Sequence, residues 1–226
     1  MIAIDLVASS FAEANAFQSV INSAFALANS TTNLVTGSYA LANTHERALN
    51  ATTNNVVILG SANSRGIQSR LVYANGNFAN IGDAQWSVTL LRNQSVSSAN
   101  TINLSLTGAN VTTNIYGSIN QLQVANNAVY GFTAMVVARD STNMFAKIWK
   151  VEGGIKNVVG AINTIPISNT NIMGTPVVNI IAADNGTNNW TITLATDIAN
   201  NALLFKATGS TNTTNWVARV DTVEVV

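Results

Sequence analysis

The sequence has no cysteine, two prolines, one histidine and very little charge. Without cysteine there is no disulfide framework and no thiolate metal site. Charged residues make up 9% of the 226 residues, against about 25% in typical soluble domains. Lys+Arg and Asp+Glu number 10 each, so the formal net charge is zero. Phosphate binding needs a basic excess, and no nucleic-acid partner is therefore expected.

Long hydrophobic runs are also missing. No apolar run approaches the ~18 residues that span a membrane, and residues 1–6 lack the basic segment of a signal peptide. We therefore expect neither membrane insertion nor a secretory signal. Asn, Thr, Ser and Ala replace the missing charge, while 47% of the residues are hydrophobic. A neutral, hydrogen-bonding surface suits a protein that associates with copies of itself, although an extracellular domain of unusual composition would also fit.

One amphipathic helix is predicted over residues 10–28, because Ser10 and Glu13 have the spacing of a capping box. The helix has few charges and needs a partner. That partner would be either its own β domain or two further copies around a threefold axis. The apolar residues at three- and four-residue steps are Phe11, Ala14, Phe17, Ile21, Ala24, Phe25 and Ala28. Among these, the predicted oligomerisation residues are Phe11, Phe17, Ile21 and Phe25.

Residues 36–85 are predicted to form an extended or β-solenoid-like connector. Glycines and small residues alternate with single apolar residues over 60–66 and 75–85, a composition typical of tight turns in solenoids. For residues 60–85 a long loop before the next strand is the alternative, and residues 39–49 could instead form a second short helix. Residues 56–59 are predicted to be a strand that Gly60 ends.

Residues 86–226 are predicted to form an antiparallel β-sandwich or jelly-roll-like domain. Short runs of Val, Ile, Thr and aromatic residues recur, separated by Asn, Gly and Ser turns. The clearest strand is 129–139, in which apolar residues alternate onto one face. The chain is therefore mainly β. It divides into an N-terminal helical oligomerisation or attachment segment (1–35), the connector (36–85) and the β domain (86–226).

No catalytic, metal or cofactor site is predicted. His45 is the single histidine and no Gly-x-Ser-x-Gly is present, so a serine triad lacks its parts. Residues 184–189 offer several oxygens but lack the full calcium loop, and a turn is expected there. The carboxylates lie beside turns or basic residues, which explains them without catalysis. Three of the four tryptophans lie in apolar strands, so core packing is favoured over sugar stacking.

Five short elements follow one another in the C-terminal two thirds of the chain. They are Phe78-Ala79…Gly82-Asp83-Ala84-Gln85, Tyr130-Gly-Phe-Thr-Ala-Met-Val-Val-Ala-Arg139, Ala146…Trp149…Gly154-Ile155, Trp190-Thr-Ile192…Ala202-Leu-Leu-Phe205 and Trp216-Val-Ala-Arg-Val-Asp-Thr-Val-Glu-Val225. In this order they resemble a β-sandwich module of tail-fibre and other virion structural proteins of tailed bacteriophages, including phages of cyanobacteria. No single element is specific, and the resemblance rests on their order.

The resemblance implies a non-enzymatic structural protein of the phage particle, without catalytic residues. It implies a homotrimer that contacts other virion proteins of the tail, baseplate or capsid. The first expectation is a short tail fibre or tail appendage, whose outer end contacts a host-surface glycan. A capsid decoration protein is the alternative, because it suits the short chain and its lone helix. A carbohydrate-binding module is a third possibility and requires exposed, aligned aromatic residues. The sequence does not identify receptor-binding residues.

Overall fold

The computed structural model is mainly β, and the part of the chain that it describes contains no helix. It describes residues 4–7, 12–14, 18–22, 26–30, 33–36, 40–44, 56–60, 62–65, 67, 70–95, 101–106, 108, 121–162 and 165–226, with side chains from residue 62 onward except in 160–169. Within these ranges no helix is long and apolar enough to cross a membrane. The chain forms two compact units, residues 1–88 with 223–226 and residues 89–222.

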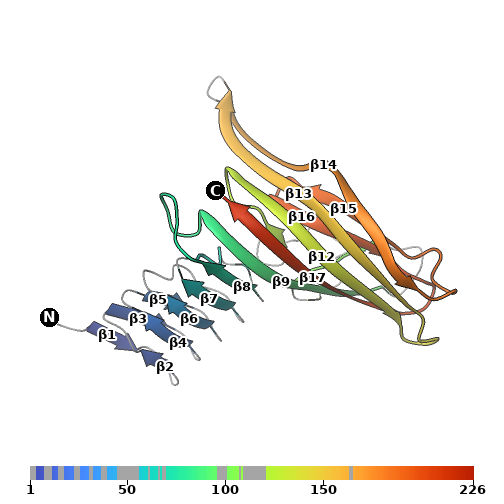
Figure 1. Ribbon diagram of the computed structural model, residues 1–226, viewed down its shortest axis with the longest axis horizontal. Helices are drawn as coiled ribbons and strands as arrows, with labels where there is room; N and C mark the ends of the chain where they lie inside the picture. The colour runs from blue at the N-terminus through green and yellow to red at the C-terminus, as the bar shows by residue number, and fades with distance from the viewer. Residues whose placement is uncertain are drawn as a thin grey trace. The chain divides into compact units, whose positions relative to one another are not determined.

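The first unit contains a stack of short parallel strands, seen as successive rungs in Figure 1. One set of strands has the order β1-β3-β5, and the other has the order β2-β4-β6-β7-β8. From β1 to β6 the chain alternates between the two sets, as in a β-solenoid with two strands per coil, and β7 and β8 continue the second set. The strands are β1 (Ile4–Val7), β2 (Ala12–Ala14), β3 (Gln18–Asn22), β4 (Ala26–Ser30), β5 (Asn33–Thr36), β6 (Ala40–Thr44), β7 (Val56–Gly60) and β8 (Arg70–Ala74).

From β1 to β6 the parallel register repeats every 14 residues, and the β6–β7 step is two residues longer. Ala12 pairs with Ala26, and Ala26 pairs with Ala40. The sequence carries the same period, in Phe11-Ala-Glu-Ala-Asn15, Phe25-Ala-Leu-Ala-Asn29 and Tyr39-Ala-Leu-Ala-Asn43. Like residues therefore stack on like residues from coil to coil, which is how each coil of a solenoid covers its neighbour.

The predicted helix over residues 10–28 is wrong for the residues described there, because they form β2, β3 and part of β4. A 14-residue coil spans about four turns of an α-helix, at 3.6 residues per turn. One coil therefore places its apolar residues at helix-like intervals, and only the repeat across several coils separates the two structures. The parallel stacking also continues through the segment predicted to be extended or solenoid-like.

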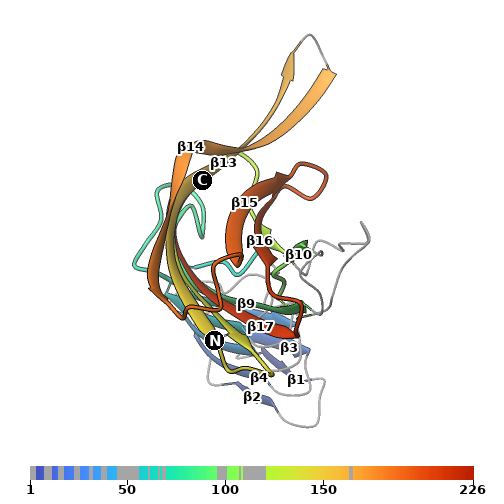
Figure 2. The same ribbon diagram turned by 90° about the vertical axis from the view of Figure 1, so that its right-hand side faces the viewer.

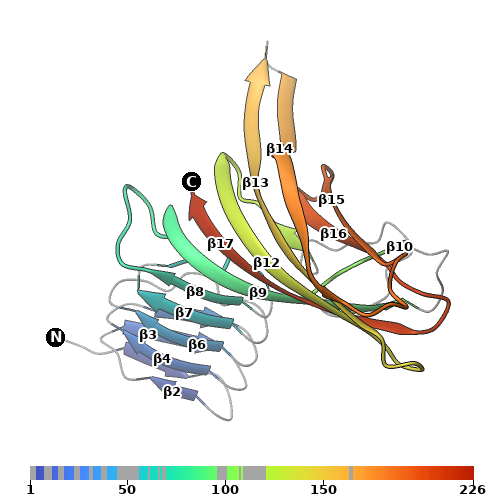
Figure 3. The ribbon, with the colours of Figure 1, turned by 45° about the vertical axis from the view of Figure 1, so that its right-hand side comes forward.

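The second unit contains two antiparallel sheets, and the strands β9 and β17 also contribute residues to the first unit. One sheet has the order β14-β13-β12-β17-β9 (Figure 3). In the other, β16 pairs with β10, β11 and β15, and Figure 2 shows β15 and β16 as a layer separate from β13 and β14. The strands are β9 (Ala84–Ser95), β10 (Thr101–Asn103), β11 (Leu122–Gln123), β12 (Ala128–Asp140), β13 (Ala146–Ile162), β14 (Ile165–Ala183), β15 (Thr191–Asp197), β16 (Ala202–Thr208) and β17 (Thr214–Val225).

Strand alternation builds the core of the second unit. In β12 every second residue from Ala128 to Asp140 is buried and those between are exposed, as the sequence predicted for this strand. Trp149 stacks on Trp216 with ring centroids 5.5 Å apart, and Trp190 lies 6.0 Å from Trp216. These three tryptophans are at most 2% exposed, so the core prediction for them is confirmed. Burying side chains of this size contributes roughly 1.5–3 kcal/mol each.

Candidate functional site

Most of the residues predicted to mediate oligomerisation lie outside the described part of the chain. These are Phe11, Phe17 and Phe25, and His45 also lies outside it. Ile21 is in β3, where the backbone is described. The four residues were predicted to share one face of a helix, and the described residues of that segment form strands. Their role in oligomerisation therefore stays a prediction.

Asp140, at the end of β12, organises two turns of the second unit. Its carboxylate accepts hydrogen bonds from the backbone N–H groups of Thr142 (2.6 Å) and Asn143 (2.9 Å). It also accepts from the Ser210 hydroxyl and the Asn212 amide, both at 3.0 Å. The backbone N–H of Asn143 is the largest cause that lowers the pKa of Asp140 to about 2, and the other three donors add to it. The group acts as a fixed acceptor between the β12–β13 turn and the segment before β17.

Other described carboxylates have similar structural partners. Asp184 accepts the backbone N–H of Ala146 at 2.8 Å, and Thr187 donates to the Asp184 carbonyl. The turn predicted at residues 184–189 is therefore present. Glu152 pairs with Lys150 on the surface. Among the described residues, no group of three or more His, Cys, Asp or Glu side chains could hold a metal ion.

A buried ion pair joins the C-terminal residues to the rest of the first unit. Glu224 is 1% exposed and pairs with the equally buried Arg70. Its carboxylate also accepts from Gln85 Nε2 at 2.7 Å and from the Ser87 hydroxyl at 2.9 Å. Arg65 Nε lies 3.4 Å from the same carboxylate. Because both charges are paired and hydrogen-bonded, the cluster is a structural anchor in the first unit.

The loop between β8 and β9 is held in shape by Asp83. Its carboxylate accepts the backbone N–H groups of Phe78 (2.8 Å), Ala79 (2.6 Å) and Asn80 (2.7 Å). These bonds, led by the one from Asn80, lower the pKa of Asp83. Gly82 has a φ of 82°, and a Cβ there would lie 2.6 Å from the Asn63 Cβ, so this position requires glycine. The loop is thus organised by local bonds.

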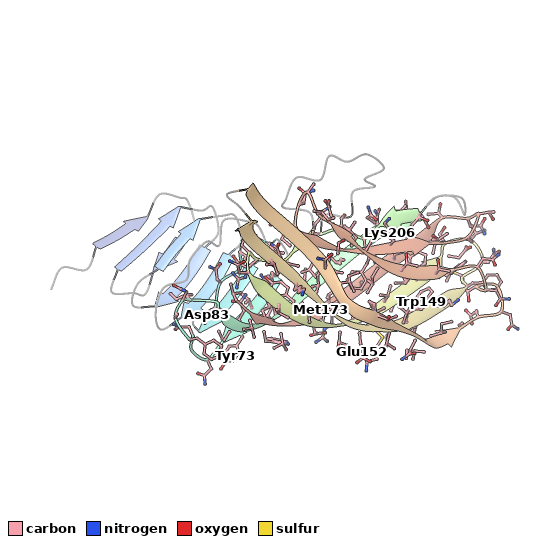
Figure 4. The ribbon with its side chains drawn as sticks, turned by 90° about the horizontal axis from the view of Figure 1, so that it is seen from above. Tyr73, Asp83, Trp149, Glu152, Met173 and Lys206 are labelled. Carbon is pink, nitrogen blue, oxygen red and sulfur yellow. The ribbon has the colours of Figure 1, made fainter. Side chains whose placement is uncertain are left out.

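This ordered loop and its flanking strands expose three aromatic side chains. Phe78 is 79% exposed, Tyr73 of β8 is 44% exposed and Trp86 of β9 is 36% exposed. We call these three residues the aromatic surface. Figure 4 labels Tyr73 and also Asp83, the residue that holds the loop. Exposed rings can stack on the apolar faces of sugars or pack against a protein. None of these three side chains is charged.

The pattern of β9 explains why Trp86 is exposed. In this stretch of β9 the inward side chains are the polar Gln85, Ser87 and Thr89. Gln85 and Ser87 face Glu224, so the usual order of apolar inward and polar outward is reversed here. Trp86 was expected to pack in the core like the other tryptophans, and the aromatic surface was not predicted. The sequence did contain a sign of this orientation, because the residues that alternate with Trp86 are the polar Gln85 and Ser87.

No family model matches this sequence, and no curated protein matches it. Three solved structures are similar in part, all of them phage tailspikes. A tailspike protein, gp49, of Acinetobacter baumannii bacteriophage Fri1, described as a capsular polysaccharide depolymerase, is 10% identical, with a TM-score of 0.33 over 92% of this chain. The tailspike of A. baumannii phage AM24 is 10% identical with a TM-score of 0.28 over 92% of this chain, and that of Acinetobacter phage vB_ApiP_P1 is 8% identical with a TM-score of 0.28 over 97%. This chain spans 36%, 42% and 49% of their lengths, respectively.

Proposed function

We propose that this chain is a non-enzymatic structural protein of a tailed-phage particle, a homotrimeric short tail fibre or tail appendage. The observation that carries the proposal is a β-solenoid with coils of 14 residues, in a chain that also forms an antiparallel β unit. A solenoid is a stiff spacer built by stacking equal coils. The low charge and the resemblance of residues 75–226 to a virion module support the same proposal.

The aromatic surface supports host contact by this appendage. Phe78, Tyr73 and Trp86 have the exposure that a glycan-stacking surface requires, and Asp83 pre-organises the loop that carries Phe78. Binding then loses little conformational entropy, since the loop is already ordered. A carbohydrate-binding role is therefore part of the same proposal and does not compete with it.

Capsid decoration is the alternative, and it rested partly on a lone N-terminal helix. Parallel strands replace that helix in the described residues. Within the described ranges we find no feature that favours a capsid anchor over a tail attachment.

The test is to locate the protein on purified phage particles with a gold-labelled antibody in the electron microscope. Label at the tail is expected. Label spread over the head would replace the proposal with capsid decoration, and unlabelled particles would exclude a virion protein. Host-cell binding by the wild-type protein and by the Phe78→Ala variant then tests glycan contact, with Val137→Ala as a control on an exposed side chain of β12.

A further inference from the structure

Strand β14 lies at the end of its sheet and exposes apolar side chains. Residues 157–183, which include all of β14, contain no charged side chain. Among the side chains of β14 that the structure describes, five large apolar ones are exposed. They are Met173 (44%), Val177 (49%), Val178 (39%), Ile180 (58%) and Ile181 (56%). Exposed apolar side chains gathered in this way are typical of an interaction surface.

The register shows which face each of these residues occupies. Ile180 pairs with Trp149, and Val178 pairs with Val151. Trp149 and Val151 are buried on the core side of the sheet, so Val178 and Ile180 continue that apolar face to a strand where it is exposed. On the opposite face, Val177 pairs with Glu152 and Met173 with Gly154. Figure 4 labels Met173 and Glu152 on this pair of strands.

The edge of β14 is open to a partner, but a regular added strand would fit it poorly. Among the strand pairings described, β13 is the one strand bonded to β14. Natural proteins usually protect such an edge with charged residues, and β14 has none. Pro176 lacks an N–H group, and the β13–β14 ladder has two irregularities. A partner is therefore expected to pack its side chains over β14 and not to add a hydrogen-bonded strand beside it.

We infer that β14 is buried against a neighbouring copy of this chain, with Val178 and Ile180 at the centre of the contact. An uncharged surface suits an uncharged partner, since a charged partner would lose hydration without gaining an ion pair. A second copy presents the same uncharged strand and carries no net charge, so no like-charge repulsion opposes the contact. The inference rests on the self-association in the proposed function and assigns a surface to it.

The full-length chain and two variants test the inference by sedimentation velocity at micromolar concentrations. Ile180→Glu places a charge at the centre of the contact. We expect it to raise the dissociation constant by about 100-fold or more, with an unchanged circular dichroism spectrum. Ile198→Glu is the matched control, because Ile198 is 57% exposed and lies outside β14. We expect it to sediment as the wild type does.

A labelling experiment covers the case in which Ile180→Glu fails to fold. The chain has no cysteine, so Ile180→Cys and Ile198→Cys each introduce one thiol. In the assembled protein a maleimide should react slowly with the Ile180→Cys variant and rapidly with Ile198→Cys.

Equal labelling rates in the assembled protein, or an Ile180→Glu variant that stays assembled, would overturn the β14 contact while leaving the proposed function in place. A monomeric wild-type protein would remove the inference together with the proposed trimer. The antibody experiment on particles still tests the virion role independently of both.

Discussion

At the scale of single residues, buried carboxylates stabilise each unit through different donors. Asp140 is held by backbone N–H groups and two polar side chains. Glu224 is held by a buried arginine with further amide and hydroxyl donors. Both carboxylates bond to residues that are distant in the sequence. The neighbouring sequence therefore does not identify their partners.

The Asp140→Asn substitution should lower the urea midpoint at pH 7, because it removes the charged acceptor from four donors. The ordinary pKa of 3.8 is lowered to about 2 in the folded protein. The stabilisation is therefore fully present above the unfolded pKa and is lost as the pH falls through the folded pKa. The difference in midpoint between wild type and variant should shrink from about pH 4 towards pH 2. A difference that is constant with pH would show that the charge of Asp140 is unimportant.

The Glu224→Gln substitution should destabilise the protein by ~3–5 kcal/mol, because it leaves the Arg70 cation buried without its ion-pair partner. Asp221→Asn is the control. Asp221 pairs with Arg219 on the surface, and such pairs contribute about 0–1 kcal/mol. Chemical denaturation of the two variants gives the comparison. Equal effects would contradict an anchoring role for the Glu224–Arg70 pair.

At the scale of strands, burial follows the alternation of side chains, and the direction of the alternation depends on what the strand faces. In β17 the inward residues include Trp216, Ala218 and Val220, which are apolar and fully buried. In the first part of β9 the inward residues are polar because they meet Glu224. The same period of two thus produces a buried tryptophan in one strand and an exposed one in the next.

The Trp216→Ala substitution should cost ~3–5 kcal/mol of stability, because it empties the centre of the tryptophan cluster. It also removes the hydrogen bond from Trp216 Nε1 to the Ser95 hydroxyl, which is 3.0 Å long. Trp86→Ala is the matched control, since Trp86 is 36% exposed, and it should cost about 1 kcal/mol or less. Thermal unfolding measures both. A larger loss for Trp86→Ala would contradict the assignment of core and surface.

At the scale of the whole molecule, the solenoid register sets the changes that the first unit can accept. Ser19 pairs with Asn33 and Leu27 with Leu41. Removal of one complete coil therefore brings equivalent positions together. Because each coil contacts its neighbours along the stack, the remaining coils keep their contacts.

Deletion of residues 18–31 should leave a folded protein with a cooperative thermal transition. Deletion of residues 18–24, half a coil, should not, because the remaining strands would meet with the wrong side chains. Circular dichroism and thermal unfolding compare the two. If both deletions fold equally well, the 14-residue register does not control the assembly of the coils.

The sequence alone determined the mainly β character of the chain and two strands close to their ends. Residues 56–59 and 129–139 were predicted to be strands, and β7 and β12 begin and end within one residue of those ranges. Alternation and turn residues are local signals, so one strand at a time is enough to identify them.

Tertiary structure alone decided the rest, because the deciding partners are distant in the sequence. The apolar residues of the N-terminal coils have the spacing of an amphipathic helix. Hydrogen bonding between coils makes these segments strands. Trp86 lies in a strand that also contains apolar residues, as a core tryptophan would. It faces outward because its neighbours Gln85 and Ser87 face inward to Glu224. Which apolar strands are covered depends on their place in the sheet: β12 is internal, whereas β14 lies at the end with its side chains exposed. Composition identifies apolar strands, but only the order of the strands shows which of them lack a neighbour.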